Sequence, residues 1–139
     1  MRNLIRLFFL VGLMLQQAQA QITIKITNDD SLGTVDAMWA VIDYYDSVHK
    51  IHVGTKQYLD PERPVPGETA KTTFTFPVSM KNIKIDVIKI WVQYIHNKGR
   101  CQVLKRIIPI KSDTLPYYPS LYSYNLSDFQ SQSPLCPKK

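Results

Sequence analysis

Cysteine and glycine are scarce in this chain, which has two cysteines and five glycines in 139 residues. Two cysteines are too few for a disulfide-dense miniprotein or a four-thiolate zinc site. Five glycines without a glycine-rich phosphate loop argue against a nucleotide-binding cradle. The hydrophobic fraction of 45% and the charged fraction of 20% are those of a globular chain. Intrinsic disorder is therefore excluded, and the length allows one domain.

The sequence also lacks the motifs that mark common catalytic and metal sites. It has no His-Glu-x-x-His zinc motif, no Gly-x-Ser-x-Gly nucleophile elbow and no EF-hand spacing among its aspartates. The only glutamates, Glu62 and Glu68, both lie at a proline-rich loop, so no acid–base pair stands out. His49 and His52 are three residues apart, which places them on opposite faces of a strand. We predict no catalytic residues, no cofactor and no metal site; a small secreted hydrolase is the alternative.

The first twenty residues have the three parts of a secretory signal peptide. Arg2 and Arg6 precede an apolar run at 7–15, and a small-x-small cleavage site, Ala-Gln-Ala, occupies 18–20. The apolar run is shorter than the roughly 20 residues that span a bilayer as a helix; an uncleaved N-terminal anchor is the alternative. The sequence thus predicts an exported protein of bacterial type, periplasmic or secreted, that is not an integral membrane protein.

After residue 20 the chain alternates apolar and polar residues in the manner of β-strands. Three segments carry this pattern: 22–27, 71–78 and 82–95. The strongest is 82–95, in which the apolar parity slips between Val87 and Ile88. A β-bulge produces such a slip, so we predict a bulged strand there, with 101–110 as its antiparallel partner.

Residues 35–45 fit two patterns. Val35, Met38 and Ile42 follow a helical stripe, with Thr34 as a candidate cap. The same segment is rich in β-branched and aromatic residues, and 48–53 resembles its return strand, so we prefer a strand. The predicted fold is an all-β antiparallel sandwich of six to seven strands, with an immunoglobulin-like arrangement as one form. An α+β fold with one helix near 35–50 is the alternative.

Residues 112–139 have a different composition, with four prolines, four tyrosines and no long apolar alternation. We expect them to form a tail that packs on a domain of residues 21–111. In an oxidising compartment, Cys101 and Cys136 are the only partners for an intrachain disulfide. This bond would tie the tail to the start of the 101–110 strand. Two free thiols, or an intermolecular bond, are the alternatives.

Two groups of residues are candidates for a binding site. The tyrosines of the tail offer large contact areas with a polar tip, which suits protein and saccharide partners, or they cover an open face of the sandwich. The basic residues between 81 and 111, on the predicted long hairpin and its flanks, could attract a polyanion, or some of them could be edge cations that prevent aggregation. The candidate binding residues are Tyr117, Tyr118, Tyr122, Tyr124, Lys98, Arg100, Lys105 and Arg106. We predict a non-catalytic module that binds a protein or a glycan and not nucleic acid; polyanion or membrane-surface binding through the basic hairpin is the alternative.

Overall fold

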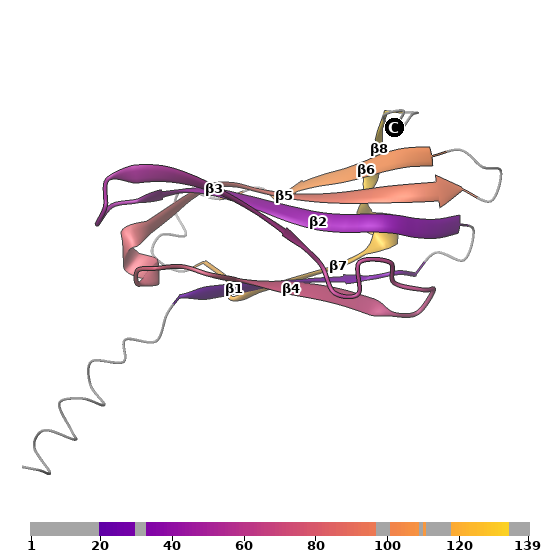
Figure 1. Ribbon diagram of the computed structural model, residues 1–139, viewed down its shortest axis with the longest axis horizontal. Coiled ribbons are helices and arrows are strands. Elements are labelled where there is room, and N and C mark those ends of the chain that lie inside the picture. The colour runs from indigo at the N-terminus through magenta and orange to yellow at the C-terminus, as the bar shows by residue number, and fades with distance from the viewer. Residues whose placement is uncertain (1–19, 30–32, 97–100, 109, 111–117, 134–139) are drawn as a thin grey trace, which may run out of the picture.

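The computed structural model describes residues 20–29, 33–96, 101–108, 110 and 118–133; side chains are described for all of these except 96, 101, 102 and 130–133. Within these ranges eight strands form two sheets, which pack face to face (Figure 1). The predicted all-β sandwich is confirmed.

The smaller sheet has three strands in the order β4-β1-β7, and the larger has five in the order β3-β2-β5-β6-β8. The smaller sheet consists of β1 (Gln21–Thr27), β4 (Thr69–Thr75) and β7 (Leu121–Asn125). The larger sheet consists of β2 (Gly33–Asp46), β3 (Ile51–Tyr58), β5 (Ile83–His96), β6 (Cys101–Ile108) and β8 (Gln130–Ser133). Two short 3-10 helices complete the described elements: η1 (Met80–Asn82) and η3 (Leu126–Asp128). The strand pairs are antiparallel except that β7 runs parallel to β1, which the prediction of an antiparallel sandwich did not include.

The core lies between the two sheets and consists of the inward-facing residues of each strand. Ile22, Ile24 and Ile26 of β1 are fully buried, as the sequence alternation predicts. On β5 of the larger sheet, Ile88 and Ile90 are also fully buried. Burial of one such side chain stabilises the fold by about 1.5–3 kcal/mol relative to leaving it in water. The intervening residues of each strand face outward and form the two outer surfaces of the sandwich.

A β-bulge interrupts the pairing of β5 with β2. Asp43 pairs with Val87 and Tyr44 pairs with Ile85, so Asp86 is an extra residue on β5. The predicted bulge is therefore confirmed, although it lies just before the predicted position rather than after Val87. The extra residue explains why the buried residues of this strand change parity along its length.

A second bulge lies in β2 and explains the ambiguous pattern near residue 35. Val35 pairs with Tyr94 and Ala37 pairs with Gln93, so Asp36 is an extra residue on β2. The bulge lets both Val35 and Met38 face the core, and this spacing of three imitates a helical stripe. The alternative of a helix near 35–50 is wrong, because 33–46 is strand and 47–50 is a turn.

The C-terminal segment contributes one strand to each sheet, and the sequence analysis assigned no strand to it. β7 pairs with β1, and β8 pairs with β6. Two side-chain contacts also fasten the segment: the Tyr118 hydroxyl accepts a hydrogen bond from the Ile85 N–H at 3.1 Å, and the Asp29 carboxylate accepts bonds from the amide and hydroxyl of Ser127. These two strands bring the described number to eight, beyond the six or seven expected.

Two predictions fall on residues that the structure does not describe. The predicted signal peptide lies outside the described residues except for Ala20, and Cys136 lies outside them as well. The signal peptide and the Cys101–Cys136 disulfide therefore stay predictions. Within the described ranges, no helix is long and apolar enough to cross a bilayer.

Candidate functional site

The tyrosines of the C-terminal segment pack against the sandwich. Tyr118 is only 8% exposed, and Tyr122 and Tyr124 are partly buried against the core. Burial raises the pKa of the Tyr122 hydroxyl, and the neighbouring Tyr124 and Tyr118 add to this effect. These positions agree with the role of covering the sandwich. Three other predicted binding residues lie outside the described residues: Tyr117, Lys98 and Arg100.

Lys105 and Arg106 are neighbours on β6, so their side chains point to opposite faces of the larger sheet. The Arg106 guanidinium lies 4.2 Å from the centroid of the Tyr124 ring. It also donates a hydrogen bond to the backbone oxygen of Asp128 at 2.9 Å. Because these contacts join β6 to the C-terminal segment, Arg106 has a structural role, and Lys105 alone of this pair belongs to the outer surface.

A row of aromatic side chains crosses the outer face of the larger sheet beside Lys105. Trp39 on β2 pairs with Tyr58 on β3 and with Trp91 on β5, and Trp91 in turn pairs with Lys105 on β6. The two indole rings are nearly parallel, with 14° between their planes and 6.3 Å between their centroids. The centroids of the Trp39 and Tyr58 rings are 6.2 Å apart. The register thus aligns three aromatic rings and a cation across four adjacent strands.

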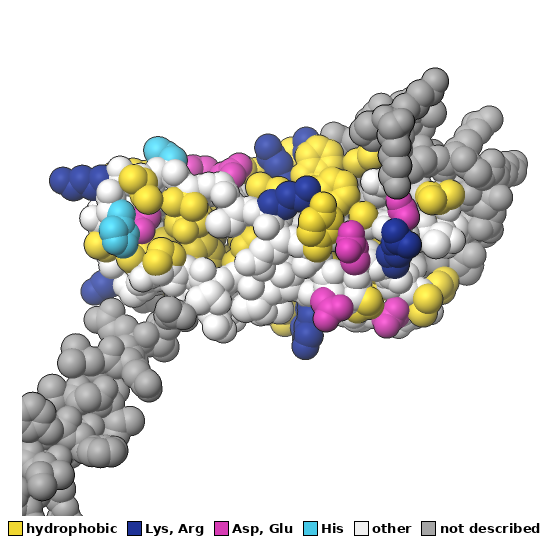
Figure 2. Space-filling view, in the orientation of Figure 1, with side chains coloured by type: hydrophobic (Ala, Val, Ile, Leu, Met, Phe, Trp, Pro, Cys, Tyr) yellow, Lys and Arg dark blue, Asp and Glu magenta, His cyan; other side chains and the backbone are white. Residues whose placement is uncertain are grey.

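Lysine side chains lie over these rings. Lys56 Nζ is 4.9 Å from the centroids of both the Trp39 and the Tyr58 rings, and Lys105 Nζ is 4.8 Å from that of Trp91. Lys56 and Lys89 occupy the adjacent row of the sheet, where both pair with Val41. Figure 2 shows hydrophobic and basic side chains gathered in this way over the middle of the larger sheet. We call the following six residues the aromatic–lysine strip: Trp39, Tyr58, Trp91, Lys56, Lys89 and Lys105.

Strand alternation determines that the strip faces outward. Trp39 lies between the fully buried Met38 and Ala40, and Trp91 lies between two fully buried residues of β5. The sequence analysis missed the strip because only the register of β2 with β5 brings the two tryptophans together. One signal was available: the apolar parity after the β5 bulge leaves Lys89 and Trp91 on the opposite face.

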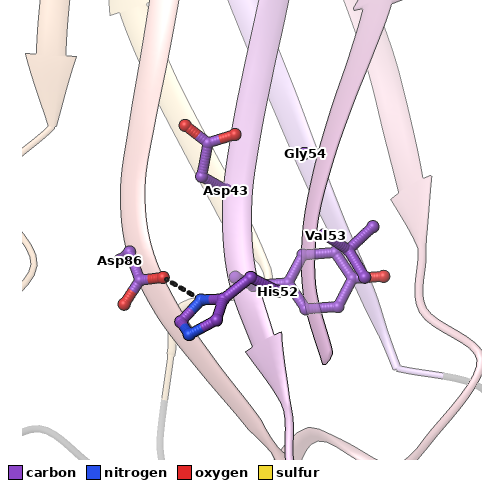
Figure 3. Close-up of a pocket in the computed structure, with 6 residues that line it drawn as sticks. Asp43, His52, Val53, Gly54 and Asp86 are labelled. Atoms are coloured by element: carbon purple, nitrogen blue, oxygen red, sulfur yellow. Dashed lines mark ion pairs between the residues drawn. The ribbon is translucent and has the colours of Figure 1, made fainter. Parts of the chain in front are cut away.

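A shallow pocket of about 160 Å³ lies on the same sheet, closer to the turn between β2 and β3 (Figure 3). The His52 ring points toward Asp86, with 3.4 Å between Nδ1 and Oδ2, and these side chains are 75% and 42% exposed. Such an exposed ion pair contributes little to stability. The pocket is lined by Asp43, Tyr44, His52, Val53, Gly54 and Asp86. Since this lining contains no Ser, Thr or Cys, it does not pair the histidine with a typical nucleophile.

His49 contacts a different carboxylate and supports the turn after β2. Its Nδ1 lies 2.6 Å from Oδ2 of the buried Asp46, and the Asp46 Oδ1 accepts hydrogen bonds from the amides of Val48 and His49 at 2.9 and 3.1 Å. Burial works against ionisation of Asp46, but the hydrogen bonds outweigh it and the pKa of this carboxyl is lowered. His49 and His52 therefore have separate structural partners.

Comparison with known proteins gives no match: no protein-family model, no curated protein and no solved structure matches the chain. Across the part of the chain that the structure describes, no three His, Cys, Asp or Glu side chains are grouped so as to hold a metal ion. The aromatic–lysine strip is the described feature whose chemistry best suits recognition of a ligand, because it combines exposed apolar rings with cations.

Proposed function

We propose that the protein is an exported, non-catalytic binding module that recognises a protein or glycan partner through the aromatic–lysine strip. The observation that carries this proposal is the row of Tyr58, Trp39 and Trp91 on the outer face of the larger sheet. Tyr58 is 52% exposed, and both indoles are partly exposed. A ligand placed on the row would remove apolar area from water, and aromatic side chains contribute most of the binding energy in many interfaces.

The fold itself does not require this row. The inward neighbours of Trp39, namely Met38 and Ala40, already fill the core beneath it. An outer sheet face needs polar residues for solubility, and a contiguous apolar group bordered by charges marks an interaction site. The strip is thus better explained by binding than by stability.

A second candidate function is the binding of a polyanion or a membrane surface. The observation that favours it is the set of three lysines in the strip, because no described carboxylate forms an ion pair with any of them. Lys89 and Lys105 belong to the basic hairpin of the sequence prediction, whereas Lys56 extends the positive surface onto β3. A hydrolase has no comparable support.

Intrinsic fluorescence tests the proposal at its own site, because the two tryptophans of the chain both belong to the strip. We expect the emission of the exported protein to change on titration with one class from a panel of neutral glycans, anionic glycans and cell-surface protein fractions. Tyr58→Ala should weaken that binding by about 2 kcal/mol, or roughly 30-fold, as expected for a central aromatic contact.

Tyr45→Ala is the matched control. Tyr45 also belongs to the outer face of the larger sheet, but it lies near the β2–β3 turn, where its ring centroid is 4.9 Å from that of His52. Binding that is unchanged by Tyr58→Ala, or weakened equally by Tyr45→Ala, would show that the partner contacts another surface.

A further inference from the structure

We infer that the ligand of the aromatic–lysine strip is an anionic glycan chain, with carboxylate or sulfate groups along a linear saccharide backbone. This inference rests on the proposed function and names the class of ligand for the same surface. It depends on the charge of the strip, the type of its cations and its length.

The charge of the strip is positive and is not compensated by an ion pair. Among the described residues, none of its three lysines pairs with a carboxylate. Two carboxylates of this face have other partners: Asp36 accepts a hydrogen bond from Gln93 at 3.1 Å and pairs with Arg63 at 3.5 Å, and Asp86 pairs with His52. Asp43 lies one row beyond Val41 and forms no ion pair with a described lysine. A bound anion would therefore gain ionic contacts without displacing a protein carboxylate.

The ring contacts help to hold the cations in place. The Lys56 ammonium lies over two rings and the Lys105 ammonium over one, so each is kept at the surface of the strip by cation–π attraction. A ligand that contacts the rings also comes close to these ammonium groups. It must therefore present apolar surface and negative charge together, which an acidic saccharide does through its C–H faces and its carboxylate or sulfate groups.

The type of cation favours a glycan over a protein partner. Protein–protein interfaces are enriched in arginine and depleted of lysine at their core, yet all three cations of the strip are lysines. A lysine is a compact point charge on a flexible stem, whereas arginine binds carboxylates in a fixed, bidentate geometry. Lysines thus suit anionic groups whose positions vary along a flexible polysaccharide.

The length of the strip favours a chain over a single sugar. The row from Tyr58 on β3 to Lys105 on β6 crosses three strand spacings of about 4.7–4.9 Å, or about 14 Å in all. Lys56 lies beside Tyr58 at one end of the row and Lys105 lies at the other. Two separated cations with aromatic rings between them match an anionic group that recurs along a polymer.

The test follows tryptophan emission while the whole exported protein is titrated with defined probes. Heparin supplies sulfate and polygalacturonate supplies carboxylate; dextran is the neutral glycan, poly-glutamate the acidic polypeptide, and phosphatidylglycerol vesicles the anionic membrane. We expect heparin or polygalacturonate to change the emission, and we expect that binding to weaken as salt screens the ionic contacts. Lys56→Gln/Lys105→Gln should weaken it about tenfold, as the loss of two partly exposed ion pairs predicts.

The matched control is Lys25→Gln/Lys71→Gln, which removes the same charge from two directly paired residues of the smaller sheet. This control should bind like the wild type. Equal loss of affinity in both double variants would place binding outside the strip and overturn this inference together with the proposed function.

Other outcomes would overturn the inference alone. Strip-dependent binding of dextran without binding of either anionic glycan would leave a glycan-binding module whose ligand is neutral. Equal or tighter strip-dependent binding of poly-glutamate would identify an acidic protein, and preference for the vesicles would identify a membrane surface. Absence of any response to the two anionic glycans also rejects the inference, while the wider panel still decides the proposed function.

Discussion

Removal of the Tyr118 hydroxyl should destabilise the protein, because this group replaces a missing strand neighbour. β6 pairs with β5 only over Ile88–Ile95, so the first residues of β5 have no β6 partner. At Ile85 the Tyr118 hydroxyl accepts the backbone N–H instead, at 3.1 Å, and both residues are buried. Tyr118→Phe keeps the ring but leaves this N–H without its acceptor. An unsatisfied buried donor costs about 1–3 kcal/mol.

Thermal unfolding measures this cost directly. For a domain of this size, about 1–3 kcal/mol corresponds to a Tm decrease of roughly 4–12 °C. Tyr122→Phe is the control, since the Tyr122 ring is also partly buried but its hydroxyl makes no hydrogen bond to a described residue. Amide exchange at Ile85 should also become faster in Tyr118→Phe. Equal Tm values for the two variants, with unchanged protection of the Ile85 amide, would refute the reasoning.

Three further predictions follow from other parts of the structure. Relative to free tryptophan, the ratio of iodide to caesium quenching should be raised in the wild type, because the ammonium groups at 4.8–4.9 Å attract the anion and repel the cation. Lys56→Gln/Lys105→Gln should bring this ratio close to that of free tryptophan, and a wild-type ratio equal to that of free tryptophan would contradict the described surface. The ionised Asp46 carboxylate, whose pKa is lowered in the folded protein, stabilises the fold at pH values above its unfolded pKa of about 3.9. This stabilisation is lost as the pH falls through the folded pKa. The Tm of the wild type should therefore fall more steeply below about pH 4 than the Tm of Asp46→Asn. Parallel Tm curves for those two proteins would show that the ionised carboxylate contributes nothing. Gly33→Ala should lower the free energy of unfolding by about 1–3 kcal/mol in chemical denaturation, because a Cβ there would lie 2.6 Å from the backbone oxygen of Ile95. An unchanged free energy of unfolding in this variant would show that the strand end moves to accommodate the methyl group.

The strands that could be predicted from the sequence are those whose burial pattern is local. β1 and β4 alternate strictly, and the parity change in β5 indicated its bulge before any neighbour was known. β2 was ambiguous because its own bulge at Asp36 places Val35 and Met38 three residues apart on the same face. A local pattern cannot separate a bulged strand from one helical turn, whereas pairing with β5 does so at once.

The two C-terminal strands could not be predicted, because their structure depends on neighbours rather than on their own apolar residues. β8 has the sequence Gln-Ser-Gln-Ser, and β7 places only tyrosines toward the core. Backbone pairing with β1 and β6, and the contacts of Tyr118 and Ser127, hold this segment. Segments of this kind have the composition of a loop, and they can be recognised as strands only when the sheet edges that pair with them are known.

The candidate site was hidden for the same reason. The predicted binding residues form basic and aromatic runs along the chain, and members of these runs have structural roles instead. Tyr118 packs inward, and Arg106 joins β6 to the C-terminal segment. The strip instead assembles one or two residues from each of four strands, so its composition exists only across the sheet. On a β-sandwich the outer face repeats every second residue along a strand, and neighbouring positions on that face come from different strands. A binding surface built this way is specified by register, and the two bulges of β2 and β5 help to set the register that brings Trp39 opposite Trp91.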